Sequence, residues 1–213
     1  MARSPQVDGQ VTEYSGSPIS FLSGGRNGDF LFSASGGVYD KLTKDVRRNG
    51  KGKSSSGFGM ILRCIGHGMP CAVVQFIKGS MPSGERDVLK ERFSDICAFH
   101  VMGEGFTWET QDRERDTEMA QAAWQKAKEL IRDETNRMVL LDEINIALRY
   151  DYLDINDVVA FLTEEKPPMT HVVLTGRNAR PELIDIADLV SEMKEIRHPF
   201  REQNIKAQPG VEF

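Results

Sequence analysis

From about residue 48 onward, short apolar runs alternate with stretches of helical period, and this alternation limits the fold more than any other feature. The apolar runs have strand length and most are rich in β-branched residues: 72–77, 97–102, 138–142, 171–175 and 189–193. The helical stretches lie around them at 54–65, 83–93, 111–134, 154–165 and 180–188. Strands that alternate with helices form a mostly parallel sheet with helices on both faces. The sequence therefore predicts an α/β fold and, without an internal repeat, one main domain.

The segment NGKGKS at 49–54 has the form of a phosphate-binding loop and leads into the first helical stretch. Its glycines allow backbone N–H groups to converge on phosphate oxygens, and the following helix adds its N-terminal dipole. In such a loop Lys53 supplies a positive charge and the Ser54 hydroxyl can bind Mg²⁺. Arg47 stands five positions before Gly52, where the usual pattern has Gly or Ala. The loop alone is equally compatible with a nucleotide site and with a lysine-rich turn.

An acidic pair, Asp142 and Glu143, stands at the end of the apolar run 138–142. Open α/β sheets bind their ligands at the carboxyl ends of the strands, so the pair can hold magnesium there. The alternative is a helix N-cap or a solvated pair of acids. Taken together with the loop, the pair favours a magnesium-nucleotide site.

The segment MGEGFTWETQDRERD at 102–116 places Phe106 and Trp108 on a glycine-containing loop, directly after another apolar run. Aromatic side chains exposed at the end of a strand suit a flat, apolar ligand. The residues alone favour, by a small margin, the alternative that both rings fill the core.

Six consecutive blocks of the sequence resemble the ATP:corrinoid adenosyltransferase family, the bacterial cobalamin-type enzymes of the P-loop fold. The blocks are GKGKSSSGFGMILRCIGHGM, VVQFIKGSMPSGE, MGEGFTWETQDRERD, VLLDEINIALRYDYLD, VVLTGRNARPELIDIADLVSEM and HPFREQNIKAQPGVEF. They cover roughly residues 49–213 in the family's order. The combination of this loop with the GFTW–TQ block distinguishes the family from other P-loop ATPases.

The resemblance implies transfer of the 5′-deoxyadenosyl group of ATP to cobalt(I) of a corrinoid, with release of triphosphate, in adenosylcobalamin biosynthesis or salvage. Reduced cobalt is itself a strong nucleophile, so the chemistry requires no general base and we assign no catalytic residue. The protein has to hold the triphosphate, orient the ribose and exclude water. The resemblance also implies Mg²⁺ as a cofactor, a homodimer and a flavodoxin-type reductant.

Roles for individual residues follow by similarity to the family. Ser54 and Glu143 hold Mg²⁺, while Phe106 and Trp108 match aromatics that contact the corrinoid and displace its lower axial ligand. The residues that match nucleotide-binding positions are Asn49, Gly50, Lys51, Gly52, Lys53, Ser54, Ser55, Arg63 and Arg177. For the two arginines, the residues alone favour surface ion pairs.

Residues 1–48 do not resemble the family. They are rich in Gly and Ser, and the charged stretch YDKLTKDVRR stands where relatives have an apolar strand. We expect residues 1–46 to be largely disordered or loosely packed, with the first strand of the sheet unfilled or poorly substituted. Such a boundary fits a reading-frame discontinuity or a diverged end. Two alternatives therefore stay open: a catalytically impaired nucleotide- or corrinoid-binding relative, and a P-loop ATPase in which Glu143 activates water.

The overall charge and the cysteines restrict the class of protein further. A net charge of −5 argues against a surface built mainly to bind nucleic acid or an anionic membrane. The three cysteines have no CxxC spacing and predict reduced, mostly buried thiols rather than a zinc site or a disulfide framework: Cys64, Cys71 and Cys97. The apolar runs are too short to cross a bilayer and no signal sequence opens the chain, so we expect a cytoplasmic location.

The four histidines are spread along the chain without metal-ligand spacing: His67, His100, His171 and His198. We expect each to be neutral and structural.

Overall fold

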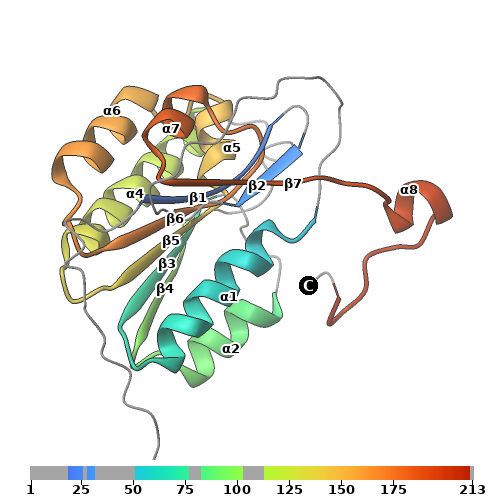
Figure 1. Ribbon diagram of the computed structural model, residues 1–213, viewed down its shortest axis with the longest axis horizontal. Coiled ribbons are helices and arrows are strands. Elements are labelled where there is room, and N and C mark those ends of the chain that lie inside the picture. The colour runs from blue at the N-terminus through green and yellow to red at the C-terminus, as the bar shows by residue number, and fades with distance from the viewer. Residues whose placement is uncertain (1–18, 26–27, 32–50, 77–82, 103–112, 212–213) are drawn as a thin grey trace, which may run out of the picture.

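The computed structural model describes residues 19–25, 28–31, 51–76, 83–102 and 113–211. Within these residues the chain is an α/β fold in which one twisted sheet lies between two groups of helices (Figure 1). The predicted fold class is confirmed.

Seven strands of the described residues form the sheet, in the order β2-β7-β1-β6-β5-β3-β4. They are β1 Ile19–Gly25, β2 Gly28–Leu31, β3 Cys71–Gln75, β4 Cys97–Val101, β5 Met138–Asp142, β6 His171–Leu174 and β7 Leu189–Met193. Neighbouring strands from β7 to β4 are parallel, and β2 runs antiparallel to β1 and β7. The structure confirms the five predicted apolar runs as strands, with ends shifted by no more than two residues.

The helices of the described residues connect these strands. They are α1 Lys53–Gly66, α2 Gly84–Arg92, α4 Arg113–Arg132, α5 Ile144–Arg149, α6 Ile155–Ala160, the π-helical turn Phe161–Glu165, α7 Pro181–Ile186 and α8 Pro199–Gln203. Side-chain caps begin three of them: Ser83 accepts a hydrogen bond from the Arg86 N–H, Asp154 accepts one from the Asn156 N–H, and His198 Nδ1 accepts one from the Phe200 N–H. The sequence did not predict α5 or α8.

Alternate side chains of the central strands point to opposite faces of the sheet and are covered by different helices. On one face Ala72 and Val74 of β3 pack in the core with Trp124 of α4. On the other face Val73 and Cys71 pack with Phe58 of α1. Figure 1 shows the same division, with α4 to α7 on one side of the sheet and α1 and α2 on the other. Both faces are buried, as a parallel sheet requires.

The N-terminal strands correct one expectation from the sequence. Residues 19–25 form β1 between β6 and β7, where Ser20 is aligned with Val173 on one side and with Leu189 on the other. The expectation of an unfilled first-strand position is therefore wrong, while the alternative of a poorly substituted one stays a prediction. The expected disorder of residues 1–46 concerns mainly residues outside those that the structure describes. A central parallel strand is held by backbone hydrogen bonds from two neighbours, which a Gly- and Ser-containing segment can also form. The proposed boundary of the main domain near residue 48 stays a prediction.

All three cysteines are free thiols and all three are buried, which confirms the burial predicted from the sequence. They lie in one core cluster on the α1 face, with Cys71 directly aligned with Cys97 on the neighbouring strand. Burial raises the pKa of Cys64 to about 11, so the thiol stays protonated at neutral pH. Burial also lowers the pKa of both His100 and His171 below 6.5, which keeps these rings neutral at pH 7.

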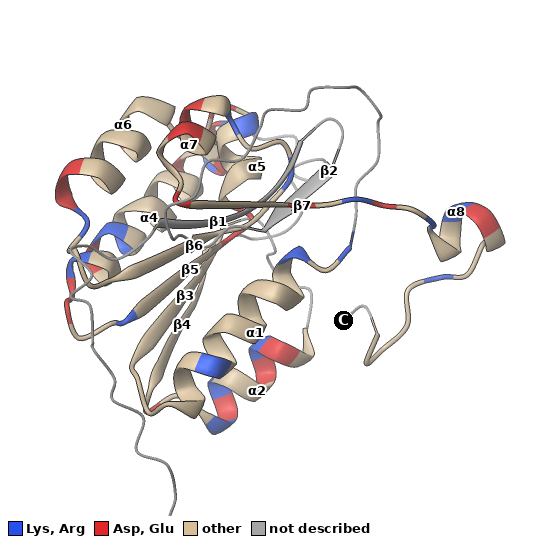
Figure 2. Ribbon diagram, in the orientation of Figure 1, with Lys and Arg blue, Asp and Glu red and all other residues tan. Residues whose placement is uncertain are grey.

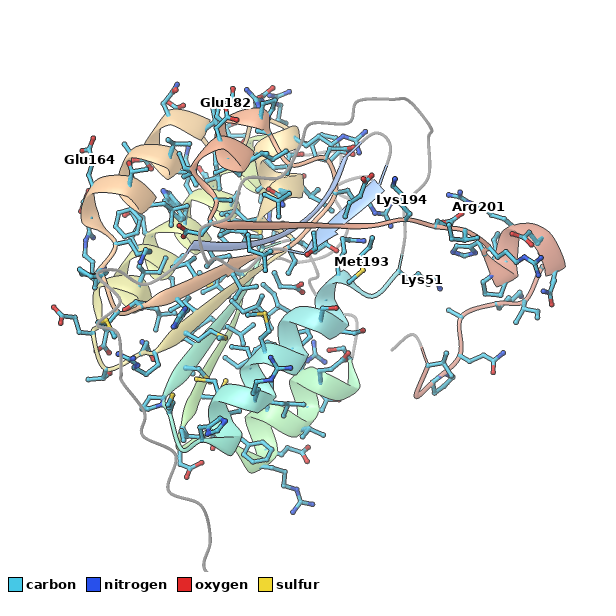
Figure 3. All side chains as sticks on the ribbon, viewed as in Figure 1. Lys51, Glu164, Glu182, Met193, Lys194 and Arg201 are labelled. Atoms are coloured by element: carbon cyan, nitrogen blue, oxygen red, sulfur yellow. The ribbon has the colours of Figure 1, made fainter. Side chains whose placement is uncertain are left out.

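Charged side chains lie mainly on the helices and on the C-terminal arm that carries α8 (Figure 2). The arm leaves β7 at Met193, and Lys194 and Arg201 lie along it (Figure 3). Phe200 and Ile196 of the arm are exposed, whereas Glu195 is largely buried and pairs with Arg201 at 2.8 Å. No helix of the described residues is long and apolar enough to cross a membrane.

Candidate functional site

The helix that follows the glycine-rich loop begins with a backbone turn that only glycine adopts easily. Gly52 has a φ of 103°, and its carbonyl accepts a hydrogen bond from the Ser56 N–H at 2.9 Å. A Cβ at this position would meet no atom within 4 Å, so the backbone angle and not space selects glycine. The first turn of α1 contains no acidic residue. The positive end of the helix dipole is therefore not neutralised by a side chain of that turn.

Lys53 is the first residue of α1 and only 6% of its surface is exposed. Ser54 is half-buried, while Lys51 and Ser55 are exposed. The core contacts of α1 fix where this end of the helix lies, because its far end at Cys64 packs with Cys71 and Cys97, which begin β3 and β4. The beginning of α1 therefore lies at the opposite edge of the sheet, where the parallel strands end. This is the edge at which open α/β sheets bind ligands.

A buried hydrogen-bonded network fixes the carboxylate at the end of β5. The side chain of Asp142 is fully buried and accepts hydrogen bonds from Gln75 Nε2 at 2.9 Å and from the Thr175 hydroxyl at 2.7 Å. Gln75 ends β3 and Thr175 follows β6, so the three residues come from three adjacent strands. Hydrogen bonds to a charged acceptor are among the stronger ones in proteins. The network holds the strand ends β3, β5 and β6 in fixed relation to one another.

Glu143 comes next in the chain and has an unusual backbone conformation. Its φ of 64° is in the left-handed region, which is uncommon for a residue other than glycine. The Glu143 N–H donates to the Thr175 hydroxyl at 2.9 Å, which ties this turn to the Asp142 network. The Oε2 atom of Glu143 is buried. The hydrogen bond to Thr175 thus offsets the strain of this turn, in which the chain leaves β5 and begins α5 with Glu143 as its N-cap residue.

The next turn of the chain closes against α5 at a glycine. Gly176 has a φ of 135°, and a Cβ added there would lie 2.9 Å from the Asn145 Cβ. Asn145 is fully buried and its N–H donates to the Thr175 carbonyl at 3.4 Å. The close approach brings Arg177, which is exposed, out at the same edge of the sheet. Arg177 is thus placed on the edge that carries Lys53 and Glu143.

The aromatic residues Phe106 and Trp108 lie outside the described residues, as do Asn49 and Gly50. The flanks of residues 103–112 are described. Met102 leaves β4 with its N–H bonded to the Gln75 carbonyl at 3.0 Å, so this segment begins beside the Asp142 network. It ends at Arg113, whose guanidinium donates to the Tyr150 carbonyl at 3.3 Å.

Arg63 is not brought to this edge. It lies ten residues after Lys53 on α1, which corresponds to about 15 Å along the helix axis. Its side chain lines a pocket with Arg137 and His171, at the edge where the strands begin. The contact of Arg63 with a nucleotide stays a prediction. The position of Arg63 within a single chain, at the edge opposite to Lys53, does not support that contact.

The oxygen donors at the site fit magnesium. Mg²⁺ prefers oxygen ligands and is usually held by one or two protein groups together with substrate phosphates and water. Ser54 offers a hydroxyl and Glu143 a carboxylate, whereas both oxygens of Asp142 already accept hydrogen bonds. The described residues contain no cluster of three or more His, Cys, Asp or Glu side chains able to hold a metal by themselves. The site is thus suited to a metal that arrives with phosphates.

Sequence reasoning missed Gln75, Thr175 and Asn145 as residues of the site. Thr175 ends the predicted run 171–175 and Gln75 is the one polar residue inside the predicted run 72–77, so polar residues in apolar runs were the available signal. Their meeting at Asp142 depends on the strand order β6-β5-β3.

Comparisons with known proteins match one family over most of the chain. A family profile described as ATP:corrinoid adenosyltransferase BtuR/CobO/CobP matches residues 47–213. A corrinoid adenosyltransferase from Sinorhizobium sp is 71% identical over 164 residues, which cover 77% of this chain and 76% of the relative. One from Pseudomonas aeruginosa is 53% identical over 165 residues, or 78% and 80% of the two chains. The corrinoid adenosyltransferase CobA of Salmonella typhimurium is 42% identical over 165 residues, or 78% and 82%.

Proposed function

The chain belongs to the ATP:corrinoid adenosyltransferase family, and from this premise we propose that it transfers the 5′-deoxyadenosyl group of ATP to cobalt(I) of a corrinoid in adenosylcobalamin biosynthesis or salvage. The observation that carries the proposal is the family match over residues 47–213, which spans the whole described site from the start of α1 to the arm beyond β7.

The reaction forms one bond and breaks one bond. Cobalt(I) donates an electron pair to the ribose C5′ and becomes cobalt(III), and the C5′–O bond breaks with its electron pair on the leaving triphosphate. Because the nucleophile is the metal of the substrate, the protein contributes by binding and orientation and by keeping water away. These tasks need positive charge at the triphosphate rather than a general base.

In this proposal the segment 49–55 wraps the triphosphate. Lys53 supports this role by its place in the first turn of α1, where its charge adds to the helix dipole. Arg177 is exposed at the same edge and can reach a bound nucleotide from the β6 side. Ser54 and Glu143 hold Mg²⁺, which when bound neutralises part of the charge on the leaving triphosphate.

The corrinoid is assigned to the aromatic pair Phe106 and Trp108. What supports this assignment is where residues 103–112 begin, since Met102 is bonded to Gln75 next to the Asp142 network. Aromatic rings in general provide a flat, apolar surface that suits a macrocycle. Removal of the lower axial ligand by these rings makes cobalt(II) easier to reduce.

We assign residues 49–213 to one P-loop domain that works as a homodimer in the cytoplasm and receives its electrons from a flavodoxin-type protein. The three free, buried thiols support a cytoplasmic location, because free cysteines are typical of proteins in a reducing compartment. Gel filtration tests the dimer, and a reduction assay with purified flavodoxin tests the electron donor.

The decisive experiment is an anaerobic assay with ATP, Mg²⁺ and chemically reduced cobalamin. We expect the spectrum of the base-on adenosylated product and one triphosphate released per product. A P-loop ATPase would instead release ADP and phosphate without any corrinoid. Corrinoid-independent ADP as the main product would overturn the proposal in favour of an ATPase, and ATP binding without either product would indicate an impaired relative.

A further inference from the structure

A second pocket lies at the edge of the sheet opposite to the nucleotide site. It has a volume of about 240 Å³ and opens between the second half of α1 and the beginnings of β5 and β6. Met138 is the first residue of β5 and is aligned with His171, the first residue of β6. Of the residues that line it, the resemblance to the family implies a role for Arg63 only, as a nucleotide contact, but Arg63 lies about 15 Å along α1 from Lys53. The pocket is thus separate from the site at the carboxyl ends of the strands.

The polar side chains that line the pocket are all basic or imidazole groups. Arg63 and His67 come from α1, Arg137 precedes β5 and His171 begins β6. The lining contains no Asp or Glu. Within the part of the chain that the structure describes, neither Arg63 nor Arg137 forms an ion pair with a carboxylate. Two arginines therefore line one concave space without a neutralising carboxylate from these residues.

Backbone hydrogen bonds fix the points from which the Arg137 and His171 side chains extend. The Arg137 N–H donates to the Pro70 carbonyl at 2.8 Å, and the Arg137 carbonyl accepts from the His171 N–H at 2.9 Å. The side chains of Arg137 and His171 thus start from adjacent strand ends whose separation is fixed.

The carboxyl end of α1 also borders this pocket, and a helix C-terminus repels anions. Here the turn after the helix reduces that effect. The Cys64 carbonyl accepts from the N–H groups of His67 and Met69, and the Ile65 carbonyl accepts from the Gly68 N–H. The last carbonyls of the helix are therefore occupied, and Arg63 adds a positive charge within the last turn.

The remaining lining is apolar and includes Met60, Cys64 and Met138. Methionine side chains adapt to ligands of different shape, and the buried Cys64 thiol stays protonated and uncharged. An inorganic anion would leave this surface uncovered. An organic anion with a short hydrocarbon or ring would cover it.

We propose that this pocket is a binding site for a small organic carboxylate, with Arg137 and Arg63 contacting the carboxylate and the methionines contacting its apolar body. A carboxylate matches the planar fork of a guanidinium, which explains why arginine and not lysine lines the pocket. The volume is below that of pockets for drug-sized ligands and limits the ligand to a short chain or one ring.

The test is calorimetric titration of the full chain, without ATP or corrinoid, with hexanoate, its neutral analogue hexanamide, and inorganic phosphate. We expect hexanoate to bind and both other compounds to bind at least ten times more weakly. The variant Arg137→Gln should weaken hexanoate binding about ten-fold or more, and Arg137→Lys should recover part of it. The control is Arg92→Gln, an exposed arginine in the last turn of α2 outside the pocket, which should leave binding unchanged.

A second readout comes from the titration of His171. Burial, Arg137 and Lys166 all lower the pKa of His171, and His67 and Arg63 face the same pocket from α1. A bound carboxylate should raise the pKa of His171, measured by NMR of the ring protons, and hexanoate should therefore bind more tightly as the pH falls towards 6.

Absence of hexanoate binding, equal binding of hexanamide, or equal binding of phosphate would each overturn the proposal. Unchanged hexanoate binding by a folded Arg137→Gln protein would do so as well. If that variant does not fold, an unshifted His171 titration in the unmodified protein decides against the site. None of these measurements involves ATP or adenosyl transfer, so their failure would leave the proposed function intact.

Discussion

Replacing Thr175 by valine tests the network that fixes the carboxylates of the site. The substitution keeps the shape of the side chain and removes only the hydroxyl. That hydroxyl donates to Asp142 Oδ1 at 2.7 Å and accepts from the Glu143 N–H at 2.9 Å, and both contacts are buried or partly buried. The variant therefore lacks one hydrogen bond to a charged group and leaves one backbone donor unsatisfied.

The expected loss of stability follows from these two contacts. A hydrogen bond to a charged group contributes roughly 1.5–3 kcal/mol, and an unsatisfied buried donor costs about 1–3 kcal/mol. Because the two effects overlap at one atom, we expect the free energy of unfolding to fall by about 3 kcal/mol. For a chain of this size that corresponds to a decrease in Tm of about 6–12 °C.

Thr170→Val is a matched control at the other end of the same strand. Thr170 is also buried, but its hydroxyl donates to a neutral group, the Asn136 carbonyl, at 3.2 Å. We expect Thr170→Val to lose about 0.5–1.5 kcal/mol and to bind ATP normally. Thr175→Val should in addition raise the Mg²⁺ concentration needed for half-maximal ATP binding by about ten-fold, since groups that orient metal ligands typically have effects of that size.

The assays are thermal unfolding followed by circular dichroism and ATP titration at a series of Mg²⁺ concentrations. Equal decreases in Tm for the two variants would refute the assignment of a special role to Thr175. Unaltered Mg²⁺ dependence in a folded Thr175→Val protein would refute the link between the network and the metal site.

Three further predictions concern the site. Lys53→Ala should abolish ATP binding in equilibrium titrations because it removes the charge at the start of α1, and undiminished affinity would contradict the loop assignment. Phe106→Ala and Trp108→Ala should leave ATP affinity unchanged and slow adenosylation that starts from cobalt(II) corrinoid, whereas loss of both ATP binding and stability would identify the rings as core residues. Gly176→Ala should lower the free energy of unfolding by about 1–3 kcal/mol, because Gly176 has a φ of 135° and a Cβ there would lie 2.9 Å from the Asn145 Cβ. The control is Gly59→Ala on α1, where a Cβ meets no atom within 4 Å and no loss of stability is expected. Similar Tm values for the two variants in thermal unfolding would contradict the expected strain at Gly176.

The central part of the fold could be predicted because each strand carries its own signal. Runs such as 138–142 are apolar at every position but the last, which is what burial on both faces of a parallel sheet requires. The position of Asp142 at the site followed from the same pattern, since the polar residue that ends such a run emerges at the carboxyl edge. Lys53 and Ser54 were found because the loop motif is local in sequence.

The missed features depend on contacts between distant segments. Gln75 and Thr175 meet at Asp142 only because β5 lies between β3 and β6, and no local pattern encodes that order. Helix α5 is a short element of six residues whose buried face is set by the core. Strand β1 has little apolar periodicity, so its place between β6 and β7 comes from pairing with those strands rather than from its own sequence.

The position of β1 also determines when the sheet can be completed during translation. Ser20 of β1 is aligned with Val173 and Leu189, so about 150 residues are synthesised between this strand and its partners, which takes roughly 8–30 s at the usual rates of elongation. The strands β3, β4 and β5 all lie within residues 71–142, and they leave the ribosome together with α1, α2 and α4 well before β6 and β7. Strand β1 can pair with β2 as soon as both are made, but its edge that faces β6 waits for the C-terminal strands, and in that interval the backbone groups of this edge are available to chaperones and to other nascent chains.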